Sequence, residues 1–360
     1  MAMHQRSGFD HSIIAADDRV LVTGAAGFIG ARVVEALLKY ESCRVRCLIR
    51  PSSDGGKLAR ILKDPAHSAR VEVVQGNLLS PADCQKAAAG VAVIYHLAAG
   101  TGSKSFPDAF LNSVVTTRNL LDAALQHGCL RRFVNLSSFA VYSNHRNQRP
   151  GILDESSPVE PHPQSRAEAY CYAKVKQDAL VVEYGKKHHL PFVLVRPGVV
   201  YGPGKYSITG RVGIDSFGIF LHTGGSNRIP FTYVDNCAEA IVLAGLRPGI
   251  EGEVFNVVDD DLPTSRQFLR AYKRQVRSFR SIYLPKFASY LFCLLWEKCS
   301  VWLDHQLPAV FTRREWRASW QRTAYPNHKL KQRLGWMPRV ATEEGMQRYF
   351  ASCREALNHA

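Results

Sequence analysis

The sequence predicts an α/β fold, with a doubly wound parallel sheet covered by helices on both faces and a smaller, mostly helical C-terminal domain. Two observations predict it. Short apolar runs of strand length alternate with amphipathic helical patterns through the first two thirds of the chain. Three glycines at three-residue spacing also stand between the first apolar run and the first helical pattern, where such sheets make a tight strand-to-helix turn.

Strand and helix signals can be assigned in order along the chain. We expect strands at Arg19–Thr23, Arg44–Ile49, Val71–Gln75, Ala92–Leu97, Arg132–Leu136, Pro191–Val195 and Val254–Val258. The patterns between them predict helices at Ala31–Lys39, Gly56–Leu62, Ala82–Ala89, Asn112–Gln126 and Ala167–Lys187. After Pro197 the sequence is irregular as far as Pro230. A strand and a helix return at Phe231–Leu246, and the part from Thr264 is mostly helical.

The composition is that of a globular protein. The chain has 360 residues, of which 46% are hydrophobic and 21% are charged, so a disordered or fibrous protein is not expected. No run reaches the roughly 18 to 20 apolar residues that span a bilayer. Residues 1–18, which we expect to be flexible, contain no apolar signal core. The nine cysteines include no CxxC pair, so we expect reduced thiols, no metal site and a cytoplasmic protein.

The formal net charge of +15 is the one unusual bulk property. Such an excess can indicate nucleic acid, an anionic membrane or phosphorylated ligands. The basic residues are spread along the chain, with denser patches at Arg266–Arg280 and Arg313–Arg333. No zinc-finger or RNP signature accompanies them, so we do not expect nucleic acid as a partner.

The glycine-rich turn points to a dinucleotide. Gly24, Gly27 and Gly30 follow the first predicted strand and open the first predicted helix. This spacing lets the backbone approach a pyrophosphate, which then meets the free N–H groups of the helix N-terminus. A plain strand-to-helix turn is the alternative, and the strand–turn–helix context favours the dinucleotide site.

The end of the second predicted strand bears on the choice of dinucleotide. Enzymes that prefer NAD usually carry Asp or Glu here, whereas an arginine pairs with the 2′-phosphate of NADP. This chain has Arg50 at that point, followed by Ser52, Ser53 and Lys57. The sequence therefore favours NADP(H) over NAD(H); the alternative is a solvated arginine beside bound NAD.

Two further motifs carry proton-transfer chemistry. Ser137 and Ser138 stand at the end of a predicted strand, and Tyr170 and Lys174 lie early in a predicted helix. Residues four apart share one helix face, so the lysine ammonium can lower the phenol pKa from its usual value near 10. A serine hydroxyl opposite can bind the same substrate oxygen. Such a group moves a proton between an alcohol and the protein while hydride leaves or joins the carbon.

With these motifs, the sequence resembles the extended short-chain dehydrogenases/reductases, the NAD(P)-dependent epimerase/dehydratase family. The resemblance runs from about Arg19 to Tyr349. The stretches that carry it are VLVTGAAGFIG, YHLAAG, VNLSSFAVYS, YCYAK, RPGVVYGPG, FTYVDNCAEA and LGWMPRV. It implies a Rossmann domain at 19–198 with returning segments at 231–258, and a substrate-binding domain made of 199–230 and 259–360.

The resemblance also assigns roles. It implies that Ser138, rather than Ser137, polarises the substrate oxygen, that Tyr170 is the acid/base and that Lys174 also holds the nicotinamide ribose. His96, a single histidine on a buried strand, is expected to be structural. The residues expected at the cofactor are Gly24, Gly27, Phe28, Ile29, Gly30, Arg50, Asn77, Leu78, Leu97, Ala98, Ala99, Tyr170, Lys174, Pro197 and Val199. Asn77 stands where the family usually has Asp.

Departures from the family pattern narrow the chemistry. Dehydratases of the group carry an acidic pair directly after the serine, whereas Phe139 and Ala140 follow it here, so loss of water is disfavoured. Val199 replaces an Asn that contacts the diphosphate in sugar-nucleotide enzymes. In the other direction, Arg228 lies seven residues before Asp235, the spacing of a family arginine that grips that diphosphate.

Arg211 could supplement Arg228, so the sequence implies both as substrate-binding residues. The leading hypothesis is an NAD(P)-dependent oxidoreductase or epimerase acting on a nucleotide-linked sugar as a homodimer. The second is a dehydrogenase or reductase of a hydrophobic alcohol, such as a sterol or flavonoid-like compound, which Val199 and the apolar C-terminal segment favour. The third, a non-catalytic dinucleotide-binding regulator, conflicts with the intact Ser138, Tyr170 and Lys174.

The segment 281–303 contains an apolar stretch with Lys286 and Lys298 at its margins. Two interpretations are open. The segment could lie in a membrane interface, or it could be a helix that covers the substrate domain. Hydroxysteroid dehydrogenases of the superfamily have membrane-associated apolar segments in this part of the chain. The sequence favours the covering helix over peripheral membrane contact.

Overall fold

The computed structural model describes residues 12–40, 42–100, 105–144, 151–166, 168–216, 218–302, 313–320 and 322–358. Within these residues a seven-stranded parallel sheet runs through the N-terminal two thirds of the chain, and the predicted Rossmann architecture is confirmed. The sheet has the order β11-β6-β5-β4-β1-β2-β3. Its strands are β1 (Arg19–Thr23), β2 (Arg44–Ile49), β3 (Val71–Gln75), β4 (Val91–His96), β5 (Arg132–Leu136), β6 (Phe192–Pro197) and β11 (Val254–Val257).

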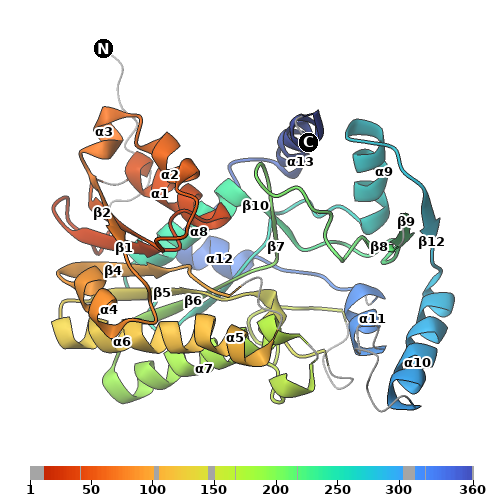
Figure 1. Ribbon diagram of the computed structural model, residues 1–360, viewed down its shortest axis with the longest axis horizontal. Coiled ribbons are helices and arrows are strands. Elements are labelled where there is room, and N and C mark those ends of the chain that lie inside the picture. Colours follow the sequence, from red (N-terminus) through yellow and green to blue (C-terminus); the bar gives the residue numbers. More distant parts are fainter. Residues whose placement is uncertain are drawn as a thin grey trace.

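Helices cover both faces of the sheet (Figure 1). On one face α1 (Phe28–Tyr40) packs against α8 (Val234–Leu246), which also contacts β4, β5 and β6. The other face is covered by α4 (Pro81–Ala88), α6 (Thr116–His127) and α7 (Ala169–His188). Shorter helices are α2 (Gly56–Ile61), α3 (Pro65–Ser68) and α5 (Phe106–Phe110), and a π-helical turn spans Leu111–Val115. In the sheet order, β2 and β3 follow on one side of β1, and β4, β5 and β6 follow on the other side. The strand order thus reverses between β1 and β4, which is where open α/β sheets bind ligands.

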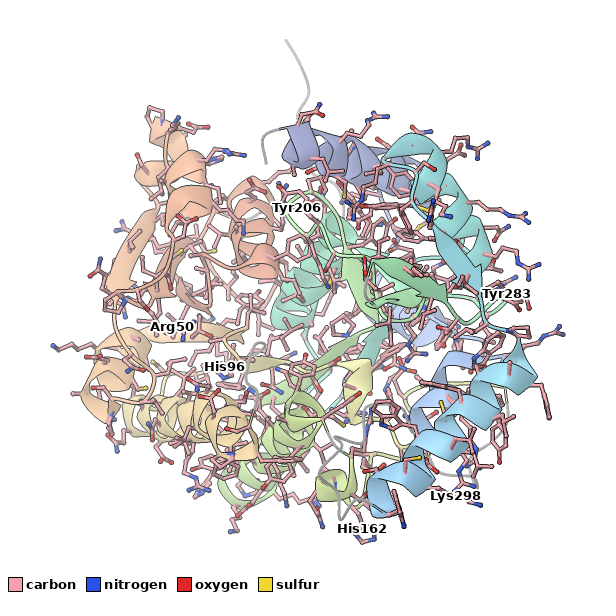
Figure 2. The ribbon with its side chains drawn as sticks, turned by 45° about the vertical axis from the view of Figure 1, so that its right-hand side comes forward. Arg50, His96, His162, Tyr206, Tyr283 and Lys298 are labelled. Atoms are coloured by element: carbon pink, nitrogen blue, oxygen red, sulfur yellow. The ribbon has the colours of Figure 1, made fainter. Side chains whose placement is uncertain are left out.

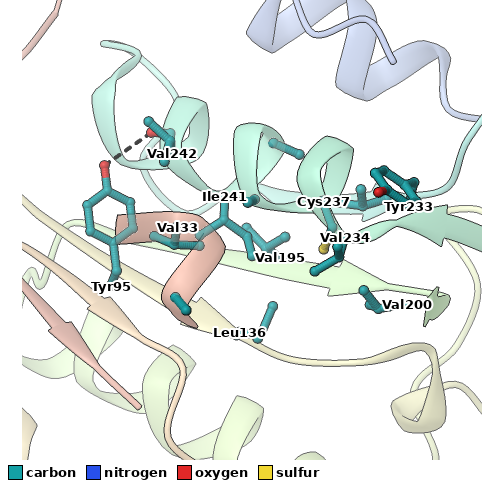
Figure 3. Packing of buried hydrophobic residues seen from close by; sticks show 14 of the residues in the cluster. Val33, Tyr95, Leu136, Val195, Val200, Tyr233, Val234, Cys237, Ile241 and Val242 are labelled. Atoms are coloured by element: carbon teal, nitrogen blue, oxygen red, sulfur yellow. Dashed lines mark hydrogen bonds between the residues drawn. The ribbon is translucent and has the colours of Figure 1, made fainter. Parts of the chain in front are cut away.

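The core between the sheet and α8 is closely packed (Figure 3). Tyr95 on β4 is fully buried, and its hydroxyl donates to the carbonyl of Val242 at 3.1 Å. Gly245 on α8 lies against the same ring, and a Cβ there would come within 2.2 Å of the Tyr95 hydroxyl oxygen. Glycine at this position thus allows α8 to approach the sheet.

The C-terminal part is built from short strands and helices. Strands β7 (Val199–Tyr201) and β10 (Phe231–Tyr233) pair in parallel, and β8 (Gly213–Ser216), β9 (Ile219–His222) and β12 (Ser281–Tyr283) form a second small sheet. Strands β7, β8 and β9 lie in the stretch before Pro230 that the sequence predicted to be irregular. They are short and are separated by glycine and proline, so they give no clear strand signal in the sequence. The helices are α9 (Ser265–Gln275), α10 (Lys286–Trp302), α11 (Arg313–Trp320), α12 (His328–Leu334) and α13 (Thr342–Asn358).

The N-terminal segment differs in part from the expectation of a flexible stretch through Asp18. The backbone N–H of Ile13 donates to the carbonyl of Leu246 at 2.9 Å, and Ile14 is buried. The folded domain therefore begins before Arg19. Residues 1–11 of the predicted flexible segment lie outside the described residues.

A chain of buried polar side chains connects the end of β1 to the helices on one face. The Thr23 hydroxyl oxygen accepts the backbone N–H groups of Leu97 and Ala98 at 3.1 and 3.2 Å. Its own proton therefore goes to Nδ1 of His96, 2.9 Å away. The other ring nitrogen, Nε2, must then carry the hydrogen and donate to Thr117 at 2.8 Å. His96 is thus a neutral structural residue held in one tautomer.

The environment of His96 makes the stability of the fold depend on pH. Burial lowers the pKa of His96 from 6.5 to about 3, and the charge of Lys174 adds to this effect. The unfolded chain protonates this imidazole near pH 6.5, so between pH 6.5 and 3 the unfolded state binds more protons. The free energy of unfolding must therefore fall as the pH falls through this window.

On going from pH 7 to pH 5, we expect protonation of His96 in the unfolded state to lower the free energy of unfolding of the wild type by about 2 kcal/mol. A His96→Asn variant keeps an acceptor near Thr23 but cannot take up a proton. It should be less stable at pH 7 and should lose about 2 kcal/mol less than the wild type over this interval. Urea unfolding at both pH values measures the difference. His162→Asn, at an exposed position, controls for removal of an imidazole, and equal losses in wild type and His96→Asn would refute this account.

Candidate active site

A cleft of about 1070 Å³ opens at the carboxyl ends of the central strands. Its walls come from the glycine-rich turn after β1, the ends of β2 and β4, the end of β5, the start of α7 and the segment after β6. All the residues that the sequence assigned to the cofactor lie in its lining: Gly24, Gly27, Phe28, Ile29, Gly30, Arg50, Asn77, Leu78, Leu97, Ala98, Ala99, Tyr170, Lys174, Pro197 and Val199.

The glycine-rich turn has the geometry of a phosphate cradle. Gly24 has φ +69°, and a Cβ there would lie 3.1 Å from the backbone nitrogen of Ala98. A Cβ on Gly30 would come within 2.0 Å of the Gly24 carbonyl oxygen. These two positions therefore require glycine, one for its backbone conformation and the other for close packing of α1 on the turn. Because Gly24 and Gly30 carry no side chain, the backbone of the turn and of the first turn of α1 is open to the cleft at these two residues.

One end of the cleft, after β2, is polar and is lined by the cations Arg50 and Lys57 and by the carboxylate Asp54. Arg50 follows β2, is exposed and lines the cleft together with Ser52, Ser53 and Lys57; Figure 2 shows its position. Asn77 lies nearby, and its side-chain oxygen accepts the N–H of Leu79 at 3.0 Å. That contact occupies the amide oxygen in a local turn. Arg50 and Lys57 thus offer positive charge to a phosphate at this end.

Ser138, Tyr170 and Lys174 all line the same cleft. Ser138 ends the segment after β5, where its hydroxyl accepts the N–H of Ala140 at 3.2 Å. Tyr170 and Lys174 lie one turn apart near the start of α7. Burial raises the pKa of Tyr170 above its usual value of 10, a hydrogen bond with Ser138 opposes the shift, and the charge of Asp178 adds to it.

This direction differs from the expectation that lysine would lower the phenol pKa, because burial outweighs the favourable contacts. The ammonium of Lys174 has its own partners. It donates to the carbonyl of Leu136 at 2.6 Å and to the side-chain oxygen of Gln177 at 2.9 Å. Burial lowers the pKa of Lys174 to about 8, partly offset by Asp178. At neutral pH the phenol is therefore protonated and the lysine is mostly charged.

The neighbouring Ser137 is engaged elsewhere. Its hydroxyl donates to Asp178 at 2.7 Å, and Asp178 also accepts from the guanidinium of Arg196 at 3.0 Å. Both charged side chains are buried. Ser137 thus belongs to a buried structural cluster, whereas the hydroxyl of Ser138 is the one directed to Tyr170.

The two arginines expected at the substrate are not in the lining of the cleft. Arg228 is exposed, and its backbone bridges to Thr264. Arg211 is half-buried, and its backbone N–H donates to the hydroxyl of Thr209, which does line the cleft. The structure therefore brings Arg211 near the wall of the cleft without placing either arginine in it.

Sequence reasoning missed two residues in the cleft lining and one buried residue behind it. Thr209 and Lys205 come from the irregular stretch after β7, and the Lys205 ammonium donates to the carbonyl of Val200 at 3.1 Å. Gln177 is buried, holds Lys174 through its oxygen and donates to Thr117 at 2.8 Å. The only signal for Gln177 was its place one turn after Lys174 on the same helix.

Comparison with known proteins gives concordant results. The model of the NAD dependent epimerase/dehydratase family matches residues 20–257. A 3beta-hydroxysteroid-dehydrogenase/decarboxylase of Arabidopsis thaliana is 26% identical over 91% of this chain and 78% of its own length. The dTDP-glucose 4,6-dehydratase of Streptomyces antibioticus is 29% identical over 66% of this chain and 71% of its own length.

Solved structures agree in fold. UDP-glucuronic acid 4-epimerase from Bacillus cereus, in complex with UDP-glucuronic acid and NAD, superposes with a TM-score of 0.70 at 22% identity, covering 94% of this chain and 99% of its own. DesIV, a dTDP-glucose 4,6-dehydratase from Streptomyces venezuelae with NAD bound, has a TM-score of 0.70 at 22% identity over 95% and 98% of the two chains. The chain therefore belongs to the NAD dependent epimerase/dehydratase family, whose members are enzymes of the extended short-chain dehydrogenase/reductase type.

Proposed function

We propose that this enzyme transfers hydride between a nicotinamide dinucleotide and a secondary alcohol or ketone of a nucleotide-linked sugar. The observation that carries the proposal is the placing of Ser138, Tyr170 and Lys174 in the lining of the cleft that begins at the glycine-rich turn. The cradle at Gly24 and Gly30 and the basic end at Arg50 fit a dinucleotide. When bound, the dinucleotide supplies the hydride acceptor or donor.

The protein residues move the proton. Tyr170 is protonated at neutral pH and gives its proton to the carbonyl oxygen of a ketone that is being reduced, which leaves a phenolate; in the reverse direction that phenolate takes the proton of an alcohol that is being oxidised. Ser138 binds the same oxygen. Lys174 stays fixed through Leu136 and Gln177, and its charge favours the phenolate that remains after the proton has left. In an epimerase, Tyr170 would perform both steps on one substrate.

The residues after Ser138 argue against dehydration. Phe139 is buried, stacks on Tyr325 with ring centroids 5.9 Å apart and packs edge-on against Tyr142. An aromatic side chain in this position supplies neither the acid nor the base that elimination of water needs. Epimerisation or a net oxidation or reduction is therefore the proposed reaction class.

Arg50 supports NADP(H) as the preferred dinucleotide. Its guanidinium is exposed at the lining of the cleft beside Ser52 and Lys57. This arrangement suits a 2′-phosphate better than a 2′-hydroxyl. The solved relatives named above hold NAD, so the preference is a property that we propose for this chain in particular.

A second substrate class competes with the nucleotide-linked sugar. Val199 lines the cleft where an Asn would contact a diphosphate, and Arg228 lies outside the lining. Both features favour a hydrophobic alcohol, the class named for the steroid-dehydrogenase relative. The two proposals differ in whether the protein binds a diphosphate, because a nucleotide-linked sugar has one and a hydrophobic alcohol does not.

Loss of the Tyr170 hydroxyl should abolish most of the activity. Tyr170→Phe removes only the proton-transfer oxygen, so we expect a turnover at least ~10²-fold lower with dinucleotide binding retained. The candidate substrates are UDP-sugars and hydrophobic secondary alcohols. Nicotinamide absorbance measures a net oxidation or reduction, and chromatographic separation of the epimers measures an epimerisation, which leaves the dinucleotide unchanged. Tyr172→Phe is the matched control, because the Tyr172 ring packs on Phe106 at 5.1 Å and lies outside the cleft lining. Near-normal turnover in Tyr170→Phe would remove Tyr170 from the mechanism.

A nucleoside diphosphate tests the substrate class. If Arg228 grips a diphosphate, the enzyme with dinucleotide present should bind UDP or GDP, and Arg228→Ala should weaken that binding by roughly 2 kcal/mol. Rising salt should weaken it too, since part of the interaction is screened. Calorimetry provides the measurement.

Arg280→Ala, an exposed arginine elsewhere, controls for a general effect of charge. If neither nucleotide binds, or if both variants lose affinity equally, the nucleotide-sugar proposal fails. The hydrophobic-alcohol proposal then becomes the better one.

A further inference from the structure

Helix α10 presents large apolar side chains to solvent. Phe287, Leu291 and Leu295 are 77%, 43% and 53% exposed, and Trp302 is 83% exposed. Their spacing of four, four and seven residues places them on one face of the helix. Exposed apolar side chains in one row mark an interaction surface rather than ordinary surface scatter.

The buried face of the same helix is made of small residues. Ser289, Cys293 and Ser300 are 4%, 7% and 2% exposed. Ser289 also accepts a hydrogen bond from the indole of Trp316 on α11 at 2.8 Å. The amphipathic pattern of α10 is therefore inverted, since the large apolar residues point outward. The sequence favoured a helix that covers the substrate domain, and α10 turns its small residues rather than its large apolar ones inward.

The neighbouring α9 shows the ordinary orientation. Its residues Phe268, Leu269 and Tyr272 are buried, whereas Arg270 is exposed. The contrast makes the exposure of α10 a local property of this helix.

Strand β12, directly before α10, extends the apolar surface. Ile282 and Tyr283 are 52% and 41% exposed. Figure 2 shows Tyr283 and Lys298 on the same side of the molecule, with β12 and α10 between them. We call the exposed side chains of Ile282, Tyr283, Phe287, Leu291, Leu295 and Trp302 the apolar edge.

The sequence around the apolar edge is strongly basic. The segment 264–322 contains twelve Lys and Arg residues against three Asp and Glu residues, and so carries more than half of the chain's net charge of +15. One of the acids, Glu297, is paired with Arg313 at 2.6 Å. Lys298 is exposed on the same face as the apolar row, where a long stem can lie among apolar groups while the ammonium reaches outward.

We propose that the apolar edge docks on the surface of an anionic lipid bilayer. An aromatic and aliphatic row flanked by lysine and arginine is the composition of a helix that lies in the plane of the interface, and anionic headgroups complement the surrounding charge. A second copy of this chain would instead bring two strongly positive segments together, which like-charge repulsion opposes. None of the helices in the part of the chain that the structure describes could span a bilayer.

Vesicle binding by the purified full chain tests the proposal. We expect the protein to sediment with vesicles of phosphatidylcholine and phosphatidylglycerol, to bind weakly to phosphatidylcholine alone, and to be released by salt. The triple variant F287S/L295S/W302S should partition on the order of tenfold or more weakly. These side chains are exposed, so its thermal unfolding midpoint should match that of the wild type.

The control variant I152S/M337S changes two apolar residues that are exposed outside the apolar edge, at 53% and 68%, and should bind as the wild type does. K286E/K298E should lose the preference for the anionic vesicles. The proposal is overturned if the wild type binds neither vesicle, or if both serine variants lose binding equally. It is also overturned if size-exclusion chromatography shows a dimer that the triple variant dissociates while vesicles have no effect; the apolar edge would then be a contact between copies.

Discussion

The candidate site depends on the hydrogen bonds of the Thr23 hydroxyl. By accepting two backbone N–H groups from the segment after β4, it ties the end of β1 to its neighbour at the place where the strand order reverses. Its single proton then goes to His96, which fixes the histidine tautomer and the direction of each later hydrogen bond. The chain continues through Thr117 and Gln177 to the ammonium of Lys174. The dinucleotide cradle and the proton-transfer group are thus connected by one buried and continuous set of hydrogen bonds.

This connection also sets the electrostatics of the cleft. The hydrogen-bonded series of side chains runs from Thr23 through His96, Thr117 and Gln177 to Lys174. Because His96 stays neutral, Lys174 is the one charged side chain in this series. Asp178 is already paired with Arg196 and accepts from Ser137, so it is not free to neutralise the ammonium fully. The positive charge of Lys174 consequently remains beside the phenol that it must serve. Burial keeps that phenol protonated until a substrate oxygen accepts its proton.

Much of this could be predicted from the sequence. Strands β1, β2, β3 and β5 begin and end where expected. β1, β2 and β5 are short runs that the sheet largely buries, whereas β3 is an edge strand that stays mostly exposed. Gly24 and Gly30, with Ser138, Tyr170 and Lys174, were found because their spacing along the chain is itself the signal. Gln177 and Thr117 could not be found that way, since their role exists only when α6 packs on α7. The apolar row of α10 was visible in the sequence, but periodicity does not say which face a helix buries.

Calorimetric titration of the purified chain with NADP⁺ and with NAD⁺ shows whether the cleft is a dinucleotide site that ends at the proton-transfer group. We expect one dinucleotide to bind per chain, with NADP⁺ bound more tightly. Arg50→Asp should remove that preference at a cost of roughly 1.5 to 3 kcal/mol in NADP⁺ binding. Arg60→Asp, an exposed position on α2 outside the cleft lining, should have little effect. A wild-type protein that binds neither dinucleotide would contradict the account.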